Sequence, residues 1–301
     1  MENKRQLILI SNDDGYQAKG LNCLIDMVAH LGDIVVCAPD GPRSGLSCAF
    51  SATTPLLLTH HPSVSVCRHP VTDPSPAPSP SVSVCRHPVT APSVDIWSCN
   101  GTPTDCVKMA LSQIVDRKPA IVVGGINHGD NASVNSHYSG TMGVVMEGCM
   151  KYIPSVAFSL CDHDPDADFE PLRPYVERYT RYVLEHGLPK GVCLNINFPK
   201  LEAPTSESSL SGPSMPAPCT GQYNGVRVCR MAHGSWLNEV TTCHHPRGYD
   251  YYWMVGNYRN DEPEAEDTDR WALDHGYVAI TPTTFDVTAY EALQSLKTLE
   301  S

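Results

Sequence analysis

The chain has 301 residues, of which 41% are hydrophobic, and a formal net charge of −12. This length and composition suit one large α/β domain, with or without an appendage, and they allow a sizeable core. The acidity excludes a broad basic surface for duplex nucleic acid, whereas a small phosphorylated substrate stays compatible with it if a local cation binds.

The N-terminal sequence and the hydropathy pattern lead us to expect a cytoplasmic protein. The first five residues are polar, and the apolar run after them covers only residues 7–10, which is short for a signal peptide. No apolar stretch approaches the roughly 20 residues of a membrane-spanning helix, so we expect no membrane partner. The 13 cysteines are odd in number and form no Cys-x-x-Cys pair. We therefore expect reduced thiols, and neither a zinc ribbon nor a redox motif.

The first two thirds of the chain alternate strand and helix patterns. Residues 7–10 read as a buried strand, apolar residues at helical spacing predict a helix over 20–31, and a second strand follows at 34–38. Further strands are predicted at 120–123, 153–158 and 192–196, and helices at 141–150 and 171–186. This alternation predicts an α/β fold with a doubly wound and mainly parallel sheet, and we assign residues 1–200 to this domain.

The last third has a different character. Residues 201–220 are rich in Ser and Pro and indicate a loop, whereas short aromatic and Val-rich runs over 223–260 indicate β-hairpins. Residues 277–282 read as a last strand, and 286–299 as a C-terminal helix. We expect residues 201–301 to complete the same domain.

A tandem duplication marks a Pro-rich insertion at about 60–95. Residues 63–72 recur at 81–90, and the Pro-rich spacer between the copies is incompatible with a helix or a strand ladder. Two copies are too few for a solenoid, so we interpret the segment as a surface loop. Its His and Cys residues allow a metal-site interpretation, but duplication explains their recurrence more simply.

Two adjacent carboxylates, Asp13 and Asp14, follow the first predicted strand. Like charges this close raise each other's pKa, and burial raises it further, unless a cation lies between them. A divalent cation suits carboxylate oxygens, and the carboxyl ends of parallel strands form the usual ligand crevice. The pair therefore indicates a metal site. The alternative is an Asx-turn or a helix N-cap before Gly15 and Gly20.

Three polar clusters follow other predicted elements and are expected at the same edge of the sheet. They lie at residues 43–47, 125–131 and 138–141. Ser44 and Asn127 offer neutral oxygens to a hard cation, while Ser139 and Thr141 offer hydroxyls at a helix N-terminus, where anions bind. Cation ligands beside an anion site together indicate metal-dependent phosphate chemistry.

These motifs, in this order, resemble the SurE family of stationary-phase survival proteins, metal-dependent 5′/3′-nucleotidases also described as acid phosphatases. The resemblance covers nearly the whole chain. The matching segments are residues 11–15, 38–40 with 43–45, 101–107, 125–127 with Gly129 and Asn131, 138–141 with Glu147 and Gly148, 194–199, 267–269 and 276–282.

The resemblance implies both the site and the activity. It implies that one divalent cation per subunit, Mg²⁺ or Mn²⁺, is held by Asp13, Asp14, Ser44 and Asn127, with the two aspartates as catalytic residues. It places the substrate phosphate near four residues: Asn131, Ser139, Gly140 and Thr141. The implied substrates are nucleoside 5′-monophosphates, with 3′-monophosphates and short polyphosphate as further candidates. The resemblance also implies that residues 1–200 form a Rossmann-like catalytic domain, and the family's β-hairpin and C-terminal extension imply a homodimer or homotetramer.

Three alternatives stay open at this point. An aspartyl-phosphate phosphatase would use Asp13 or Asp14 as a nucleophile, but such enzymes usually carry Asp-x-Asp. A non-catalytic nucleotide- or phosphate-sensing module would bind without turnover. A calcium-stabilised structural protein would use four alternating aspartates, which lack the Gly and terminal Glu of an EF-hand loop: Asp162, Asp164, Asp166 and Asp168.

Three further polar residues are candidates for supporting roles. His128 next to Asn127 is a candidate phosphate donor or general acid. Asp105, with Thr104 as the alternative, is expected to cap a helix through Val107. Asp269 is a candidate to reach the site from the C-terminal extension.

Overall fold

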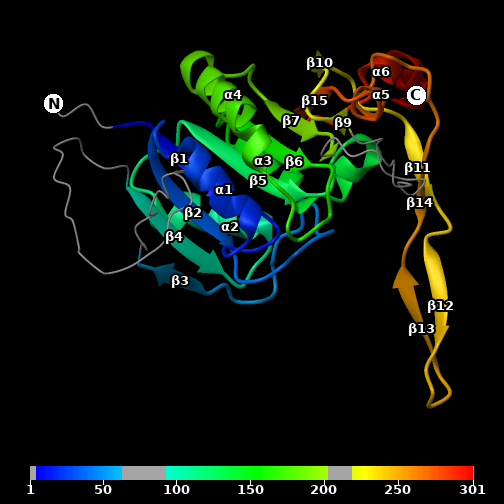
Figure 1. The fold of residues 1–301 in the computed structure, drawn as a ribbon, viewed down its shortest axis with the longest axis horizontal. Coiled ribbons are helices and arrows are strands. Elements are labelled where there is room, and N and C mark those ends of the chain that lie inside the picture. Colours follow the sequence, from blue (N-terminus) through cyan, green and yellow to red (C-terminus); the bar gives the residue numbers. More distant parts are fainter. Residues whose placement is uncertain (1–4, 63–92, 203–218, 301) are drawn as a thin grey trace, which may run out of the picture.

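A nine-stranded sheet forms the centre of the molecule in the computed structural model, which describes residues 5–62, 93–202 and 219–300 (Figure 1). The strand order is β10-β15-β7-β6-β5-β1-β2-β4-β3. These strands are β1 (Leu7–Ser11), β2 (Asp33–Pro39), β3 (Leu58–His61), β4 (Val94–Cys99), β5 (Ile121–His128), β6 (Ser155–Leu160), β7 (Val192–Phe198), β10 (Val226–Val228) and β15 (Val278–Thr284).

The sheet is mainly parallel, as predicted. Strand β1 pairs in parallel with β2 and β5, and the parallel pairing continues through β4 on one side and through β6 and β7 on the other. Two pairings are antiparallel, those of β3 with β4 and of β15 with β7. The central strands are buried along most of their length, which is why they read as apolar runs in the sequence.

Helices cover both faces of the sheet and create two cores. Side chains alternate along a strand, so Ile8 and Ile10 pack with α1 and α4, whereas Leu9 packs on the opposite face with α2 and α3. The α/β fold class is therefore confirmed, with helices on both faces. The helices are α1 (Lys19–Val28), α2 (Pro103–Met109), α3 (Gly140–Met150), α4 (Arg173–His186), α5 (Asp269–Asp274) and α6 (Tyr290–Leu296).

Two strands of the sheet, β3 and β4, were not predicted. They flank the duplication, and β4 is only half buried over its first four residues because it lies next to the edge strand. The duplication itself falls within residues outside the described part. His60 and His61 lie on β3, where they contact Asp95 Oδ1 at 2.7 Å and Ser98 Oγ at 2.8 Å, so both have polar partners within the sheet.

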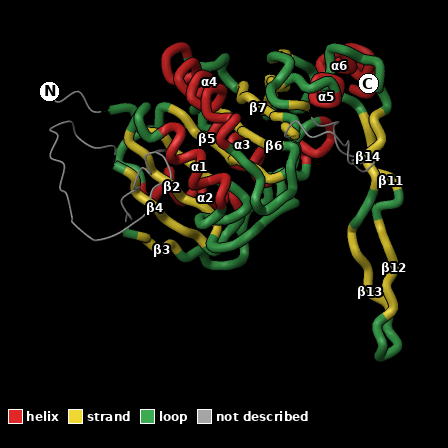
Figure 2. Tube along the Cα trace, in the orientation of Figure 1, coloured by secondary structure: helices red, strands yellow, loops and turns green. Residues whose placement is uncertain are grey.

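The predicted hairpins are confirmed over residues 234–260, where they form a projecting arm, whereas β10 in the same predicted region pairs in parallel with β15 of the central sheet. We call residues 234–260 the hairpin arm; it contains β11 (Gly234–Leu237) paired with β14 (Asn257–Asn260), and β12 (Val240–His244) paired with β13 (Asp250–Met254). The arm extends away from the sheet (Figures 1 and 2).

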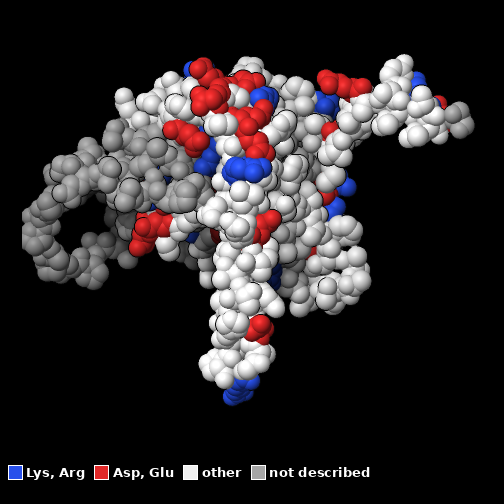
Figure 3. Space-filling model, turned by 90° about the vertical axis from the view of Figure 1, so that its right-hand side faces the viewer, with Lys and Arg blue, Asp and Glu red and all other residues white. Residues whose placement is uncertain are grey.

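Few atoms on the visible face of the arm belong to charged residues (Figure 3). Tyr252, Trp253 and Met254 are 64%, 62% and 74% exposed. An exposed aromatic and aliphatic strip of this kind is typical of an interaction surface.

Two predictions about the ends of segments need correction. Residues 201–220 are not all loop, because β8 (Leu201–Glu202) pairs with β9 (Cys219–Thr220); the stretch between them lies outside the described residues. The C-terminal helix α6 is shorter than predicted and continues as a 3-10 turn over Lys297–Glu300.

Helix α2 begins with a reciprocal cap. The N-cap is Thr102, whose hydroxyl accepts the N–H of Asp105 at 3.1 Å, while the Asp105 carboxylate accepts the N–H of Thr102 at 2.9 Å. Asp105 therefore caps the helix as expected, although from its third position, and Thr104 is not the cap. The same carboxylate accepts the N–H and hydroxyl of Ser51. Burial raises the Asp105 pKa, but these hydrogen bonds outweigh it and hold the pKa below its usual value.

Replacing Asp105 by Ala should lower the free energy of unfolding by about 2–3 kcal/mol, because the variant loses the cap and leaves the N–H groups of Ser51 and Thr102 without their acceptor. Urea unfolding at pH 7 measures the loss. Asp105→Asn, which keeps one acceptor oxygen, should lose less. An Ala variant as stable as the wild type would show that the cap contributes nothing.

Candidate functional site

A cavity of about 400 Å³ lies where the loops at the carboxyl edge of the sheet meet the base of the hairpin arm. These loops gather between the sheet and the arm (Figure 2). The lining side chains come from distant parts of the chain: Asp13, Ser44, Asn127, His128, Asp130, Asn131, Asn135, Tyr138, Ser139, His163 and Trp236.

The turn after β1 leaves Asp13 and Asp14 uncommitted to capping. Asn12 closes this turn instead, since its Oδ1 accepts the N–H of Gly15 at 3.2 Å and its Nδ2 donates to the Gly15 carbonyl. Helix α1 has Ala18 at its N-cap and no side-chain cap. The alternative that the aspartates serve as an Asx-turn or a helix cap is therefore wrong.

Asp13 is the more deeply buried of the two carboxylates, with 4% of its surface exposed. The Thr141 hydroxyl donates to its Oδ1 at 2.5 Å. Burial raises the pKa of Asp13 from 3.8 to about 6; the Thr141 hydrogen bond opposes this rise, and the Asp14 charge adds to it. A Cβ on Gly140 would lie 2.6 Å from Asp13 Cβ, so only glycine allows helix α3 to approach this closely.

Asp14 presents an unsatisfied oxygen. Among the described residues its Oδ2 atom is buried and has no hydrogen-bond partner. Burial raises the pKa of Asp14, and the backbone N–H of His128 opposes that rise. A buried carboxylate oxygen without a donor is costly, and a bound cation is one way to compensate it.

The side-chain carbonyl oxygen of Asn127 lies near the Thr141 hydroxyl that binds Asp13. Its Nδ2 donates to the Gly129 carbonyl at 2.8 Å, while its Oδ1 lies 3.5 Å from the Thr141 hydroxyl that binds Asp13. Ser44 is exposed and lines the cavity. Three of the four predicted metal-ligand residues, Asp13, Ser44 and Asn127, thus line one cavity, and Asp14 follows Asp13 in the chain without being among its lining residues. The donor set of two carboxylates, an amide and a hydroxyl matches what a hard divalent cation binds.

The predicted phosphate-binding residues divide into two groups. Asn131 and Ser139 line the cavity; the Ser139 Oγ accepts the N–H of Met142 at 3.0 Å as the N-cap of α3, which leaves its own proton available to a ligand. Gly140 and Thr141 are not among the lining residues of the described cavity, because both are buried against Asp13. Their contacts are with the carboxylate.

A network of buried asparagines that the sequence analysis did not identify positions Asn131. The Asn131 N–H donates to Asn197 Oδ1, and its carbonyl accepts the Asn195 side chain, both at 2.8 Å. Its own Nδ2 donates to Ser159 Oγ at 2.8 Å. Asn195 and Asn197 lie on β7, where polar residues alternating in an apolar strand were the available signal.

His128 and the acidic loop beside it also have defined surroundings. Burial lowers the pKa of His128, whose ring packs edge-on against Phe169 with centroids 4.9 Å apart. Near pH 7 it is therefore mainly neutral.

In the acidic loop, Asp162 and Asp164 each accept a backbone N–H two residues ahead. Within the described residues, no group of three or more His, Cys, Asp or Glu converges as a metal site.

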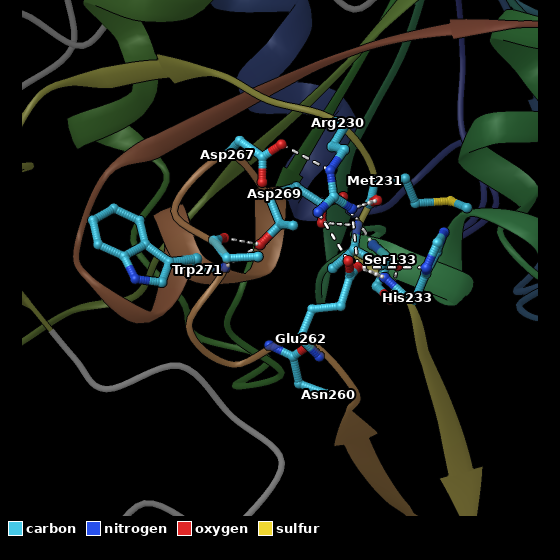
Figure 4. Close-up of polar contacts among 12 residues, drawn as sticks. Ser133, Arg230, Met231, His233, Asn260, Glu262, Asp267, Asp269 and Trp271 are labelled. Atoms are coloured by element: carbon cyan, nitrogen blue, oxygen red, sulfur yellow. Dashed lines mark hydrogen bonds and ion pairs between the residues drawn. The ribbon is translucent and has the colours of Figure 1, made fainter.

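Asp269 does not line the cavity but supports it from the C-terminal part. Its carboxylate accepts the N–H of Ser133 and that of Ala232, both at 2.9 Å, and so joins the loop after β5 to the segment that leads into the hairpin arm. Next to it, Arg230 lies between Glu262 and Asp267 (Figure 4). The sequence analysis named Asp269 as a candidate but did not predict this supporting role.

Replacing Asp269 by Ala should lower the free energy of unfolding by about 2–4 kcal/mol, because two buried N–H groups lose their acceptor. Asp267→Ala is the matched control: this carboxylate lies two residues away, is 68% exposed and binds Arg230, so its loss should cost less than about 1 kcal/mol. Denaturant titration compares the two variants. Equal losses would contradict the supporting role of Asp269.

Replacing Asp13 by Asn should stabilise the metal-free protein at pH 7.5 by about 3 kcal/mol, because the buried charge costs free energy once the pH exceeds its raised pKa of about 6. The carboxyl group takes up its proton as the pH falls through 6 toward 3.8, so the gain should shrink over that range. Thermal unfolding in EDTA at pH 7.5 and pH 5 measures both effects. A variant no more stable than the wild type at pH 7.5 would show that the Asp13 charge is already compensated.

Fold and cavity together define a Rossmann-like α/β protein with a carboxylate-centred site at the carboxyl edge of its sheet. The family model described as survival protein SurE matches residues 8–238. The chain belongs to the SurE family, and the predicted resemblance is confirmed.

Relatives and one solved structure match this chain over nearly its full length. A Phocaeicola vulgatus protein named 5′-nucleotidase SurE is 48% identical over 297 residues, covering 99% of this chain and 98% of that protein. A Bacteroides fragilis protein of the same name is 46% identical over 300 residues, covering all of both chains. The crystal structure of the SurE protein from Aquifex aeolicus matches with a TM-score of 0.70 at 29% identity, covering 98% of this chain and 100% of that one. Within the described residues, no helix has the length and apolar character to cross a membrane.

Proposed function

We propose that this chain is a metal-dependent phosphomonoesterase that hydrolyses nucleoside 5′-monophosphates to nucleoside and phosphate. Relatives named 5′-nucleotidase SurE, 45–48% identical over 98–100% of the chain, support the reaction. The observation that carries the mechanism is the buried, unpartnered Oδ2 of Asp14 beside the raised-pKa carboxylate of Asp13. Nucleoside 3′-monophosphates and short polyphosphate are further proposed substrates.

Four side chains would hold one Mg²⁺ or Mn²⁺ ion: Asp13, Asp14, Ser44 and Asn127. Their oxygen-only donor set suits both ions. When bound, the ion would neutralise charge on the phosphoryl group and lower the pKa of water.

The remaining residues would bind and orient the substrate. The Ser139 hydroxyl, at the N-terminus of α3, would donate to a phosphate oxygen. The buried Asn131, which lines the same cavity, would contact the phosphate as well. Gly140 and Thr141 would act by fixing Asp13, since both contact its carboxyl group. Asp14 would orient the attacking water and accept its proton. His128 also lines the cavity, and its imidazole would be mainly neutral near pH 7 because burial lowers its pKa.

Self-association into a homodimer or homotetramer is part of the proposal. The hairpin arm supports it, because its apolar residues are exposed on a segment that projects from the body. A second copy of the chain would bury this strip.

Phosphate release from a panel of 5′- and 3′-nucleoside monophosphates, with Mn²⁺, with Mg²⁺ and with EDTA, tests the proposed function. We expect release that requires the cation, and Asp14→Asn should reduce kcat by at least about 10²-fold because it removes one negative charge from the site. Asp164→Asn, which neutralises a carboxylate in the nearby acidic loop, is the control and should leave kcat unchanged.

Two outcomes would count against the proposal. Normal turnover by Asp14→Asn would remove this residue from the mechanism. Saturable nucleotide binding without phosphate release, in a folded and metal-loaded protein, would favour a sensing module instead.

A further inference from the structure

Two aromatic side chains line the cavity. Trp236 and Tyr138 are among its lining residues, together with the polar residues Asp13, Asn131 and Ser139. Trp236 comes from β11 at the base of the hairpin arm, almost 100 residues after Ser139 in sequence. The proposed mechanism assigns no role to either ring.

The Trp236 ring is held in place by three contacts. Its Nε1 donates to Asn135 Oδ1 at 2.9 Å. Its ring meets Tyr258 edge to face, with centroids 6.1 Å apart and an interplanar angle of 69°. Gly256 lies against the same ring, because a Cβ added there would stand 3.1 Å from Trp236 Cε3. A ring fixed from several sides loses little conformational freedom when a ligand binds.

The groups behind the ring are themselves fixed. Asn135 Nδ2 donates to Asp130 Oδ1 at 3.1 Å, and the Tyr258 hydroxyl contacts Ser133 Oγ at 2.5 Å. The guanidinium of Arg270 lies over the Tyr258 ring, 5.1 Å from its centroid. These contacts satisfy the indole N–H and leave a partly exposed apolar ring surface at the cavity.

We propose that Trp236 is the residue on which the base of the nucleotide stacks. Every nucleobase has a π-face, so a fixed indole binds purines and pyrimidines without reading their hydrogen-bonding edges. Tyr138, which is 59% exposed and directly precedes Ser139, would border the same base-binding region. This inference rests on the proposed function and extends it, because it assigns the part of the site that distinguishes a nucleotide from a simple phosphate ester.

The test compares adenosine 5′-monophosphate with ribose 5-phosphate, which keeps the sugar and phosphate but lacks the base. In Trp236→Ala, kcat/KM for the nucleotide should fall about 5- to 150-fold, mainly through KM, while kcat/KM for ribose 5-phosphate should change by less than about twofold. Trp236→Phe keeps a ring and should retain most of the preference. Trp253→Ala, which removes an exposed indole of the arm, should leave the preference unchanged.

Two results would overturn the proposal. If Trp236→Ala reduced kcat/KM equally for both substrates, the indole would support the loop after β5 and not the base. If it changed neither value, the ring would have no part in substrate binding.

Equilibrium binding gives a second measurement that does not depend on turnover. Titration calorimetry of both ligands with wild type and Trp236→Phe should show tighter binding of the nucleotide in each. Indole fluorescence should be quenched by adenosine 5′-monophosphate in the wild type and much less in the Phe variant. Equal affinity for both ligands in the wild type would overturn the stacking role. Tight nucleotide binding without phosphate release from any substrate would overturn the proposed reaction and leave the stacking role supported.

Discussion

Burial of two adjacent carboxylates at the end of β1 is the constraint around which the rest of the site is arranged. Asp13 lies against the N-terminus of α3, where Gly140 permits close approach and Thr141 supplies a hydroxyl. Asn12 closes the turn, so the two aspartates have no capping role. The close approach of α3, the turn closed by Asn12 and the side-chain orientation of Asn127 together surround the two carboxylates. Among the described residues they leave the Oδ2 atom of Asp14 without a hydrogen-bond partner.

The C-terminal third of the chain completes this arrangement from the other side. Strand β15 joins the central sheet, and Asp269 on the adjacent helix α5 holds both the loop after β5 and the segment leading to β11. Because the contact of Asp269 with Ser133 spans 136 positions and its contact with Ala232 spans 37, the geometry of the cavity depends on folding of nearly the whole chain. The site therefore belongs to the complete domain and not to its N-terminal half.

The sequence allowed the central strands, the α/β class and the aspartate pair to be predicted, because each depends on a local pattern. Residues 7–10 are apolar and followed by a polar turn, which identifies a buried strand ending at a ligand crevice. Strands β3 and β4, at the edge of the sheet, were not predicted because the alternation of apolar and polar residues is weak in half-buried strands. The contacts of Trp236, Asn195 and Asn197 were not predicted because their partners lie far away in sequence. The alternating polar residues of β7 mark Asn195 and Asn197 as unusual but do not say which residue each of them contacts.

Strand β3 at the edge of the sheet explains how the chain accommodates an internal duplication. The connection that carries it leaves β3 after His61, which pairs with Ile96 of β4, and re-enters the sheet at Val94, which pairs with Ile34 of β2. The entropic cost of closing a loop grows slowly with its length, by only about 0.6 kcal/mol for each doubling. An edge hairpin is thus a place where a gene can gain or lose codons with little thermodynamic consequence for the protein, and where a peptide tag could be inserted while the sheet keeps its pairing.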